Sequence, residues 1–321
     1  MTCRKLDRII LFLFITITLA FLWSAAAPAA FVDVGLGARP VGLGRAFVAL
    51  ADDANAMLYN PAGLAHLDRM ELTSMYARLY PGVEDDKLHL GYVGLVKPLR
   101  RIGTLGFGFT NLWADLYGEN VFYFSYAREV GSGLGLGGNL KLLRWSAEGY
   151  TDPETGQSER GRSWSGFSLD VGLLYVWRSE SLLRLTRADG LQLGLALFNI
   201  NQPSVAENGS AQAKLPLGFE GGIVYLKGGS RSLLSFSRRD EKTRFHLGQE
   251  IELWARQSPL GPSAFLIRAG ALAMLSDQKG GEFDFGCGFT LRKALFDYAY
   301  VFPLALRDAG GCHKLSIGYA F

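Results

Sequence analysis

The sequence predicts an all-β fold, a transmembrane antiparallel β-barrel of about fourteen strands with a short N-terminal helical plug. Three observations predict it. Residues 313–321 alternate strictly between large apolar or aromatic side chains and smaller or polar ones, as in a strand that separates lipid from a polar lumen. The first residues have the pattern of an export signal. Hydrophobic residues make up 49% of the chain, yet no continuous apolar span follows that signal, so the apolar side chains are distributed by alternation.

Residues 1–29 are predicted to be a cleaved signal peptide. Basic residues at Arg4, Lys5 and Arg8 precede an apolar run over residues 9–23, and the small residues of 25–30 supply an A-x-A cleavage site ending at position 29. The alternative is a retained anchor, but an apolar run of about fifteen residues is short for a helical span. We therefore expect the mature chain in the bacterial outer membrane, in contact with its lipid. The formal net charge of +3 falls close to zero without the signal, which implies no nucleic-acid partner.

Residues 30–68 do not alternate and form a separate segment ahead of the predicted barrel of residues 69–321; the family resemblance described below implies that this segment is a plug. Residues 45–50 and 53–58 are short, Ala-rich and capable of helix. Asp52 or Asp53 can serve as an N-cap, and Pro61 can open a further turn after Asn60. One interpretation of these residues is a static plug without a gating role, in which the aspartates cap helices and Asn60 forms a turn before proline.

Alternating strands are predicted along the rest of the chain, at residues 71–79, 87–99, 105–109, 122–126, 134–142, 167–177, 191–197, 215–225, 230–238, 245–253, 265–275, 282–291, 294–302 and 313–321. The number is even, as expected for a bacterial single-chain barrel. Short connections at residues 97–103, 129–133, 227–230 and 292–294 fall at one end, and longer ones at 147–163 and 200–213 fall at the other. Because periplasmic turns are short and the number of strands is even, the start of the first strand and the end of the last strand are both expected to face the periplasm.

The charged residues of these strands fall on the inward-facing register, where they avoid the cost of about 2–4 kcal/mol that a basic side chain meets at the middle of the lipid face. The predicted lumen-lining residues are Asp170, Glu220, His246, Glu250, Glu252, Arg268, Glu282, Asp284 and Asp297. They either line a solute path or form a structural network inside the lumen.

The run GARPVGLGRAFVALADDANAMLYNPAGLA resembles the N-terminal signature of PorV/PorQ family outer-membrane proteins and, more distantly, that of FadL-like long-chain fatty acid and aromatic hydrocarbon transporters. The final FDFGCGFTLRKALFDYAYVF and KLSIGYAF also resemble the end of PorV/PorQ proteins. The resemblance implies a fourteen-stranded barrel with its N-terminal segment in the lumen. In FadL-like proteins that segment gates a hydrophobic pathway, which by analogy places Asp52, Asp53, Asn60, Pro61, Ala62 and Gly63 in a plug or gate.

The same resemblance leaves two functions open. The first is gated passage of hydrophobic small molecules, and the second is a PorV-like role in which the barrel binds protein-export components or exported cargo. The connections are modest in length compared with those of FadL-like chains, which weakens the case for a high-affinity external pocket.

An outer-membrane enzyme is the main rival of another class, because His246 lies on an inward register near Glu250 and follows serines at Ser235 and Ser237. The four histidines do not cluster in the sequence, and a lone lumen histidine is more often part of a polar network. No catalytic residue, metal site or cofactor is therefore predicted. Cys287 and Cys312 remain after signal removal, and nothing in their positions supports a disulfide.

Overall fold

The computed structural model shows a closed barrel of fourteen strands in which every strand is antiparallel to its two neighbours. The structure describes residues 30–82, 87–99, 101–151, 156–177, 190–206, 213–239, 242–257, 261–275, 280–307 and 310–321, so the predicted signal peptide lies outside them. The barrel strands are β1 (Glu71–Arg78), β2 (His89–Leu99), β3 (Gly103–Trp113), β4 (Tyr117–Gly131), β5 (Leu134–Ala147), β8 (Arg162–Trp177), β9 (Gly190–Phe198), β10 (Gly218–Lys227), β11 (Ser230–Arg239), β12 (Lys242–Arg256), β13 (Ser263–Met274), β14 (Gly281–Leu291), β15 (Ala294–Pro303) and β16 (Cys312–Ala320).

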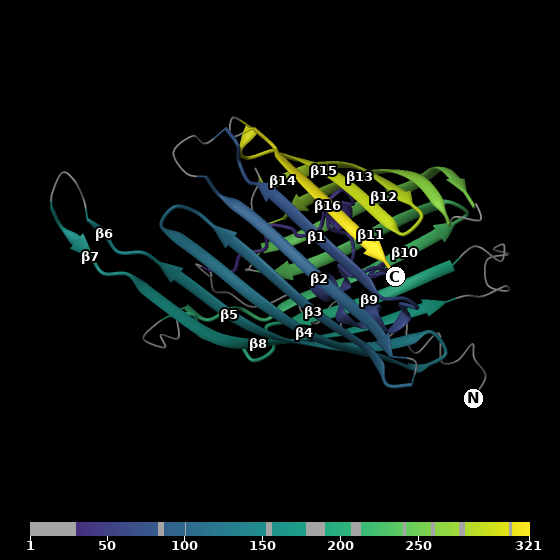
Figure 1. Ribbon diagram of the computed structural model, residues 1–321, viewed down its shortest axis with the longest axis horizontal. Coiled ribbons are helices and arrows are strands. Elements are labelled where there is room, and N and C mark those ends of the chain that lie inside the picture. The colour runs from purple at the N-terminus through teal and green to yellow at the C-terminus, as the bar shows by residue number, and fades with distance from the viewer. Residues whose placement is uncertain are drawn as a thin grey trace.

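The predicted fold class is confirmed, and each of the predicted strands corresponds to one strand of the wall. β16 pairs with β1 from Glu71 opposite Ala320 to Arg78 opposite His313, which closes the barrel and leaves no free sheet edge (Figure 1). The prediction for β10 began too early: Leu215 donates its amide to Pro203 in the preceding connection, so the strand starts only at Gly218.

The alternation that predicted the strands sets the two faces of the wall. On β16, Lys314 and Ser316 are buried, whereas Leu315 and Ile317 between them are exposed on the outer face. The same period of two leaves a band of exposed Leu, Ile, Val and Phe side chains around the barrel, which is the surface expected to meet lipid. Cys287 and Cys312 are both free.

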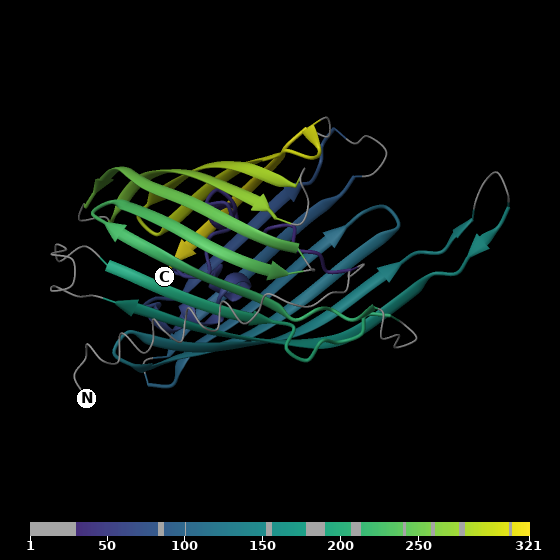
Figure 2. The same ribbon diagram turned by 180° about the vertical axis from the view of Figure 1, so that it is seen from behind.

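The two ends of the barrel differ in their connections. Tight turns join β2 to β3, β4 to β5, β10 to β11 and β14 to β15 at the end where β1 begins and β16 finishes, which we call the short-turn end. The opposite, long-loop end carries the connection between β5 and β8, in which β6 (Tyr150–Thr151) and β7 (Ser158–Glu159) form a separate hairpin. This hairpin extends beyond the barrel in both the front and the back view (Figures 1 and 2).

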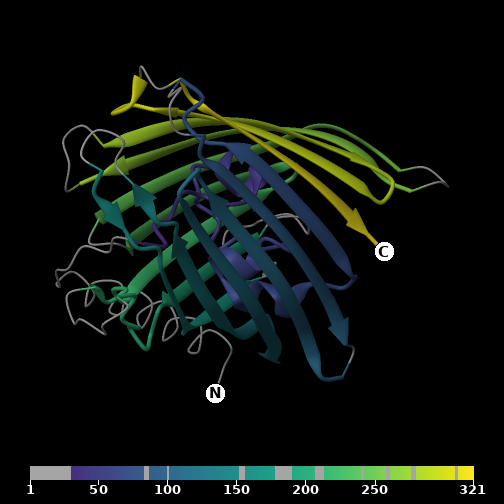
Figure 3. The ribbon, with the colours of Figure 1, turned by 60° about the vertical axis from the view of Figure 1, so that its left-hand side comes forward.

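The N-terminal segment lies inside the wall of strands (Figure 3). Its regular elements are short: α2 (Ala38–Val41), α3 (Ala56–Tyr59) and the 3₁₀ helix η1 (Pro61–His66). No helix among the described residues is long and apolar enough to cross a bilayer. The helix predicted over residues 45–50 is absent, because Arg45 and Ala51 adopt left-handed backbone conformations with φ of 63° and 35°, which an α-helix does not accept.

The turn predicted around Pro61 is confirmed. Pro61 opens η1, and the side chain of Asn60 accepts a hydrogen bond from the Ala62 amide, as an N-cap residue does. The aspartate cap is displaced relative to the prediction: α3 starts after Asn55, whose amide donates to the Asp53 carboxylate at 2.8 Å, so Asp53 supports the turn that enters the helix.

Candidate functional site

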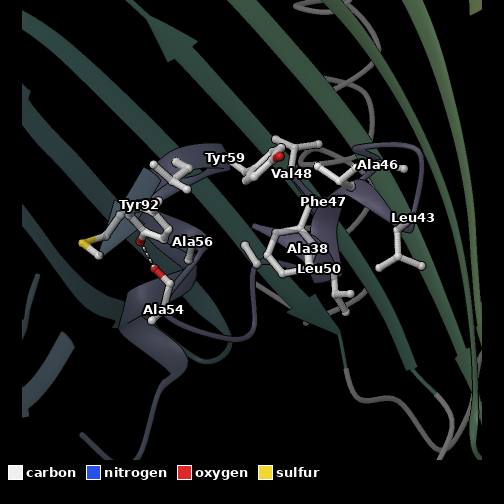
Figure 4. Packing of buried hydrophobic residues seen from close by; sticks show 14 of the residues in the cluster. Ala38, Leu43, Ala46, Phe47, Val48, Leu50, Ala54, Ala56, Tyr59 and Tyr92 are labelled. Atoms are coloured by element: carbon white, nitrogen blue, oxygen red, sulfur yellow. Dashed lines mark hydrogen bonds between the residues drawn. The ribbon is translucent and has the colours of Figure 1, made fainter. Parts of the chain in front are cut away.

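The N-terminal segment packs against the wall at the level of the backbone. Residues 36–64, here called the plug body, are almost entirely buried, and Phe47, Leu50 and Tyr59 pack together in their centre (Figure 4). On the facing strands, glycines stand where other residues would collide. A Cβ atom added to Gly248 would lie 2.6 Å from the Leu43 carbonyl oxygen. The plug body therefore fits only because the wall has no side chains at these positions.

Asn60 is the residue that ties the plug body to itself and to the wall. It is fully buried, and its Nδ2 donates to the Val48 carbonyl at 2.7 Å within the plug and to the Leu173 carbonyl of β8 at 3.0 Å. Its Oδ1 accepts from Ala62 at 3.1 Å. Pro61, Ala62 and Gly63 follow in the buried turn. The predicted gate residues of this turn are thus held by a complete set of hydrogen bonds.

Asp52 and Asp53 belong to an ion-pair network at the short-turn end, which we call the latch network. Both aspartates lie 2.7 Å from the Arg39 guanidinium, which also contacts Glu250 of β12 at 3.1 Å. Tyr92 of β2 adds a hydrogen bond to the Ala54 carbonyl (Figure 4). The latch network therefore joins the plug body to the wall through charged groups.

Glu250 is the centre of the latch network on the wall side. Its side chain is fully buried, and it lies 2.6 Å from both Arg268 and Arg231. Arg268 in turn reaches Asp297 at 2.7 Å. Buried carboxylates are stable as ions only when paired and hydrogen-bonded, and here three guanidinium groups supply the partners.

Three of the other predicted lumen residues form ion pairs nearer the long-loop end. Asp170 lies 2.7 Å from Lys141, Glu220 lies 2.8 Å from Arg239, and Glu282 lies 2.7 Å from Arg45 of the plug. Asp284 is fully buried, and neither of its carboxylate oxygens has a hydrogen-bond partner among the described residues.

Glu252 keeps the inward register of Glu250, because it pairs directly with Leu266, two positions from Arg268 on β13, and it is exposed. It lies near the short-turn end of β12, where its amide donates to Gly229 in the turn between β10 and β11. The pairing of β12 with β13 shifts register between Glu252 and Trp254, so the alternation is interrupted only after Glu252.

His246 is buried and held by two hydrogen bonds of 2.8 Å, one between Nε2 and the Ser237 hydroxyl and one between Nδ1 and the Gly44 carbonyl. The group that orients the imidazole is thus a plug carbonyl, whereas Glu250 pairs with arginines. A serine hydrolase needs a carboxylate or equivalent behind the histidine and an accessible serine. Within the described ranges, no three His, Cys, Asp or Glu residues gather as metal ligands.

Two cavities lie in the long-loop half of the lumen, separated by residues 32–34. The first has a volume of about 140 Å³ and is bordered by the plug and by strands β2 to β5 and β8 to β11. Apolar side chains such as Leu58, Leu90 and Phe198 share this border with charged ones such as Lys141, Asp170 and Arg239. The second has a volume of about 190 Å³ and is bordered by β1 and β12 to β16. Val32, Asp33 and Val34 border both, so this short segment, which we call the arm, divides one larger space.

Charged side chains hold the arm in place. Lys314 of β16 donates to the Val34 carbonyl at 2.8 Å, and the Asp33 carboxylate lies 3.6 Å from Arg239. Burial disfavours the charged form of Asp33, but Arg239 and Arg45 outweigh it and hold the pKa of this carboxyl well below its usual range. The arm therefore carries a stable negative charge between basic groups of the wall.

Sequence reasoning did not select several residues of these networks: Asp33, Arg39, Arg45, Arg239 and Lys314. A signal was available for three of them, because Asp33, Arg39 and Arg45 are charged residues in a segment otherwise rich in glycine, alanine and apolar residues. Such residues are buried only with partners. Lys314 was on the inward register of the last strand, but the carbonyls that it contacts lie in the arm, which no local pattern connects to it.

Comparison with known proteins identifies the fold. No protein-family model and no curated protein matches the chain. Among solved structures, it is similar to the CymD monoaromatic hydrocarbon channel, with 14% identity, a TM-score of 0.61 and coverage of 91% of this chain and 99% of that one. The Ralstonia pickettii toluene transporter TbuX has 12% identity, a TM-score of 0.61 and coverage of 91% and 100%. A Pseudomonas aeruginosa FadL homologue has 13% identity, a TM-score of 0.54 and coverage of 92% and 100%.

Proposed function

We propose that this chain is a non-enzymatic outer-membrane channel for small hydrophobic solutes, and that its N-terminal segment is the gate. The observation that carries the proposal is the pair of cavities on either side of the arm, which are bordered by plug-body residues such as Leu58, Tyr59 and Arg45. A solute entering from the long-loop end reaches these partly apolar cavities first and the closed plug second. Movement of the plug residues Asp52, Asp53, Asn60, Pro61, Ala62 and Gly63 is then required for passage onward.

The size of the cavities favours a solute of about one aromatic ring. A cavity of about 150 Å³ accommodates benzene, and the two cavities here have volumes of about 140 and 190 Å³, with apolar and charged side chains at their borders. A long acyl chain does not fit either of them while the arm stays in place. The names of two structural neighbours, a monoaromatic hydrocarbon channel and a toluene transporter, support the same class of solute for this chain.

Uptake of radiolabelled toluene tests this function, in a bacterial host without such a channel that exports the full chain to its outer membrane. The expected result is faster initial uptake than with an empty vector. Val32→Trp and Val34→Trp should lower it severalfold, because each fills cavity space with an indole ring. Val93→Trp is the matched control, since Val93 is 48% exposed on the outer face of β2. If the empty-vector strain and the strains with the full chain or its variants took up toluene equally fast while the barrel was present in the membrane, the proposal would be contradicted.

The gate has its own test in liposomes that contain the purified barrel. A fluorescent fatty acid probe and a single-ring probe are compared for the intact chain and for a chain that lacks residues 35–67. A gate predicts that deletion raises uptake of both probes, whereas the intact chain accelerates only the smaller one. A static plug that takes no part in passage predicts faster uptake of neither probe by the intact chain.

A PorV-like role in protein export is the second candidate, and the β6–β7 hairpin is the observation that favours it. Both of its strands are exposed, and the hairpin extends beyond the barrel rim (Figure 2). A projecting polar hairpin is available to a partner protein. Crosslinking of outer-membrane export components to the full chain, lost when residues 149–160 are replaced by a short Gly-Ser turn while toluene uptake is kept, would establish this role.

A further inference from the structure

Five side chains form a row across five neighbouring strands on the outer face, at the long-loop end. Direct pairing places Trp113 of β3 beside His89 of β2, His89 beside Arg78 of β1, Arg78 beside His313 of β16, and His313 beside Tyr300 of β15. We call this set the outer row. Two of the four histidines, which do not cluster in the sequence, thus come to lie on either side of one arginine, because β1 closes the barrel against β16 (Figure 1).

Aromatic side chains hold both histidines of the outer row. The ring of His89 stacks on Trp113 with centroids 5.1 Å apart, and its Nδ1 lies 2.8 Å from the Tyr76 hydroxyl. On the other side of Arg78, the Nδ1 of His313 lies 2.7 Å from the Tyr298 hydroxyl. In both histidines the tyrosine hydroxyl is hydrogen-bonded to Nδ1, so Nε2 is the ring nitrogen left for an external ligand.

Arg78 has no ion-pair partner among the described residues, and it is partly exposed. The outward-facing positions of β14, β15, β16, β1, β2 and β3 contain no aspartate or glutamate. Because adjacent strands are about 4.8 Å apart, the two histidine backbones lie about 10 Å apart across Arg78. That span matches one phosphate group in contact with the guanidinium and within reach of both imidazoles.

The outer row lies at the edge of the apolar band. Arg78 ends β1 and His89 begins β2, whereas the outward residues further along the neighbouring strands are apolar, as Leu315, Ile317 and Val93 show. In an outer-membrane barrel this edge is the level of the lipid headgroups, where aromatic residues also gather. This step rests on the membrane location proposed above.

We propose that the outer row binds the phosphate group of an anionic lipid in the outer leaflet. The guanidinium of Arg78 presents a planar fork of donors that matches a phosphate, and the Nε2 atoms of His89 and His313 supply further donors on each side. Trp113 and Tyr300 border the site with ring faces and edges that pack on the lipid. The lipid would thereby fix the seam between β1 and β16 in the membrane.

Native mass spectrometry of the full chain in detergent tests the site, with diphosphorylated lipid A and its dephosphorylated form as probes. The intact chain should retain the phosphorylated lipid at concentrations at least tenfold lower than the dephosphorylated one. Arg78→Gln should weaken phosphorylated lipid binding by about tenfold or more, since it removes the charged fork. Arg128→Gln is the matched control, because Arg128 is also exposed and outward on the wall, but at the short-turn end of β4.

The double variant His89→Gln with His313→Gln should weaken binding severalfold while Arg78 stays in place, and it carries the test if Arg78→Gln fails to assemble. Equal binding of the two lipid forms, or an unchanged affinity in both variants, would overturn the proposal. Inorganic phosphate at millimolar concentration is the competitor that separates free phosphate from lipid-borne phosphate. If it displaced the lipid as effectively as an equal concentration of lipid A phosphate groups, the site would bind free phosphate and the proposal would be overturned. The assay needs no transport, so its failure is distinct from a failure of toluene uptake.

Discussion

The two halves of the lumen are built from the same alternating strands, yet one is filled and the other is hollow. In the short-turn half the plug body lies against wall glycines, and the latch network pairs every charge around Glu250. In the long-loop half Asp33 and Arg239 face each other at the border of a cavity. An inward charge therefore does not by itself indicate a solute path. We infer that the charges beside the plug body are structural, whereas those beside the arm border the space that a solute would enter.

Glu250→Gln is expected to have the largest effect on the filled half. The amide keeps the shape of the side chain but leaves Arg39, Arg231 and Arg268 without their shared carboxylate, and breaking a buried ion pair costs about 3–5 kcal/mol. The measurement is urea-induced unfolding of the barrel in lipid vesicles. Glu252→Gln, on the same strand but exposed, should change the free energy of unfolding by less than about 0.5 kcal/mol. Equal effects of the two variants would show that the latch network is not structural.

Gly270→Val tests the close packing of the plug body. A Cβ atom at this position would collide with the backbone of Leu43 and Gly44, so the plug body must move away from β13. We expect a loss of about 1–3 kcal/mol of stability and a rise in single-channel conductance in planar bilayers. Ala269→Val adds similar volume on the outward register of the same strand and should leave conductance unchanged. A variant that stays closed would contradict the packing argument.

Asn60→Ala should cost about 1–3 kcal/mol, since the carbonyls of Val48 and Leu173 lose their buried donor and the Ala62 amide loses its acceptor. Asn60→Asp separates these contributions, because the carboxylate keeps the acceptor but has no donor. Thermal unfolding followed by gel mobility would measure both variants. Near-wild-type stability of Asn60→Asp would mean that the cap, rather than the bonds to the carbonyls, holds the turn.

Asp33→Asn is expected to have the smallest effect on stability, under about 1 kcal/mol, because the carboxylate is partly exposed at the cavity border. Its pKa is lowered in the folded protein, so its contribution is present above the pKa of the unfolded chain and is lost only as the pH falls through the lower folded value. The arm should thus stay docked between pH 7 and 5. A fluorescent label at position 32 that reports release of the arm over this range in the intact chain would contradict that expectation.

Local sequence patterns predicted the barrel strands correctly, but only some of the features of the candidate site. The period of two located every barrel strand, since it reflects which face each side chain must meet. The turn at Asn60 and Pro61 followed from their own backbone preferences. The helix over residues 45–50 was predicted from alanine content, but Arg45 adopts a left-handed backbone conformation and its side chain pairs with Glu282 of the wall. The alternation also predicted the inward register of Glu252, but not its exposure near the end of β12.

The sequence by itself determined the barrel, its even number of strands and the inward direction of most charges, because each of these depends on the alternation along one strand. Only the tertiary structure decided which charges meet. Arg39 reaches Glu250 across 211 positions and Lys314 reaches the arm across 280, and the outer row exists only after β16 pairs with β1. Such contacts are set by closure of the barrel around the plug, and closure brings together residues that no local pattern relates.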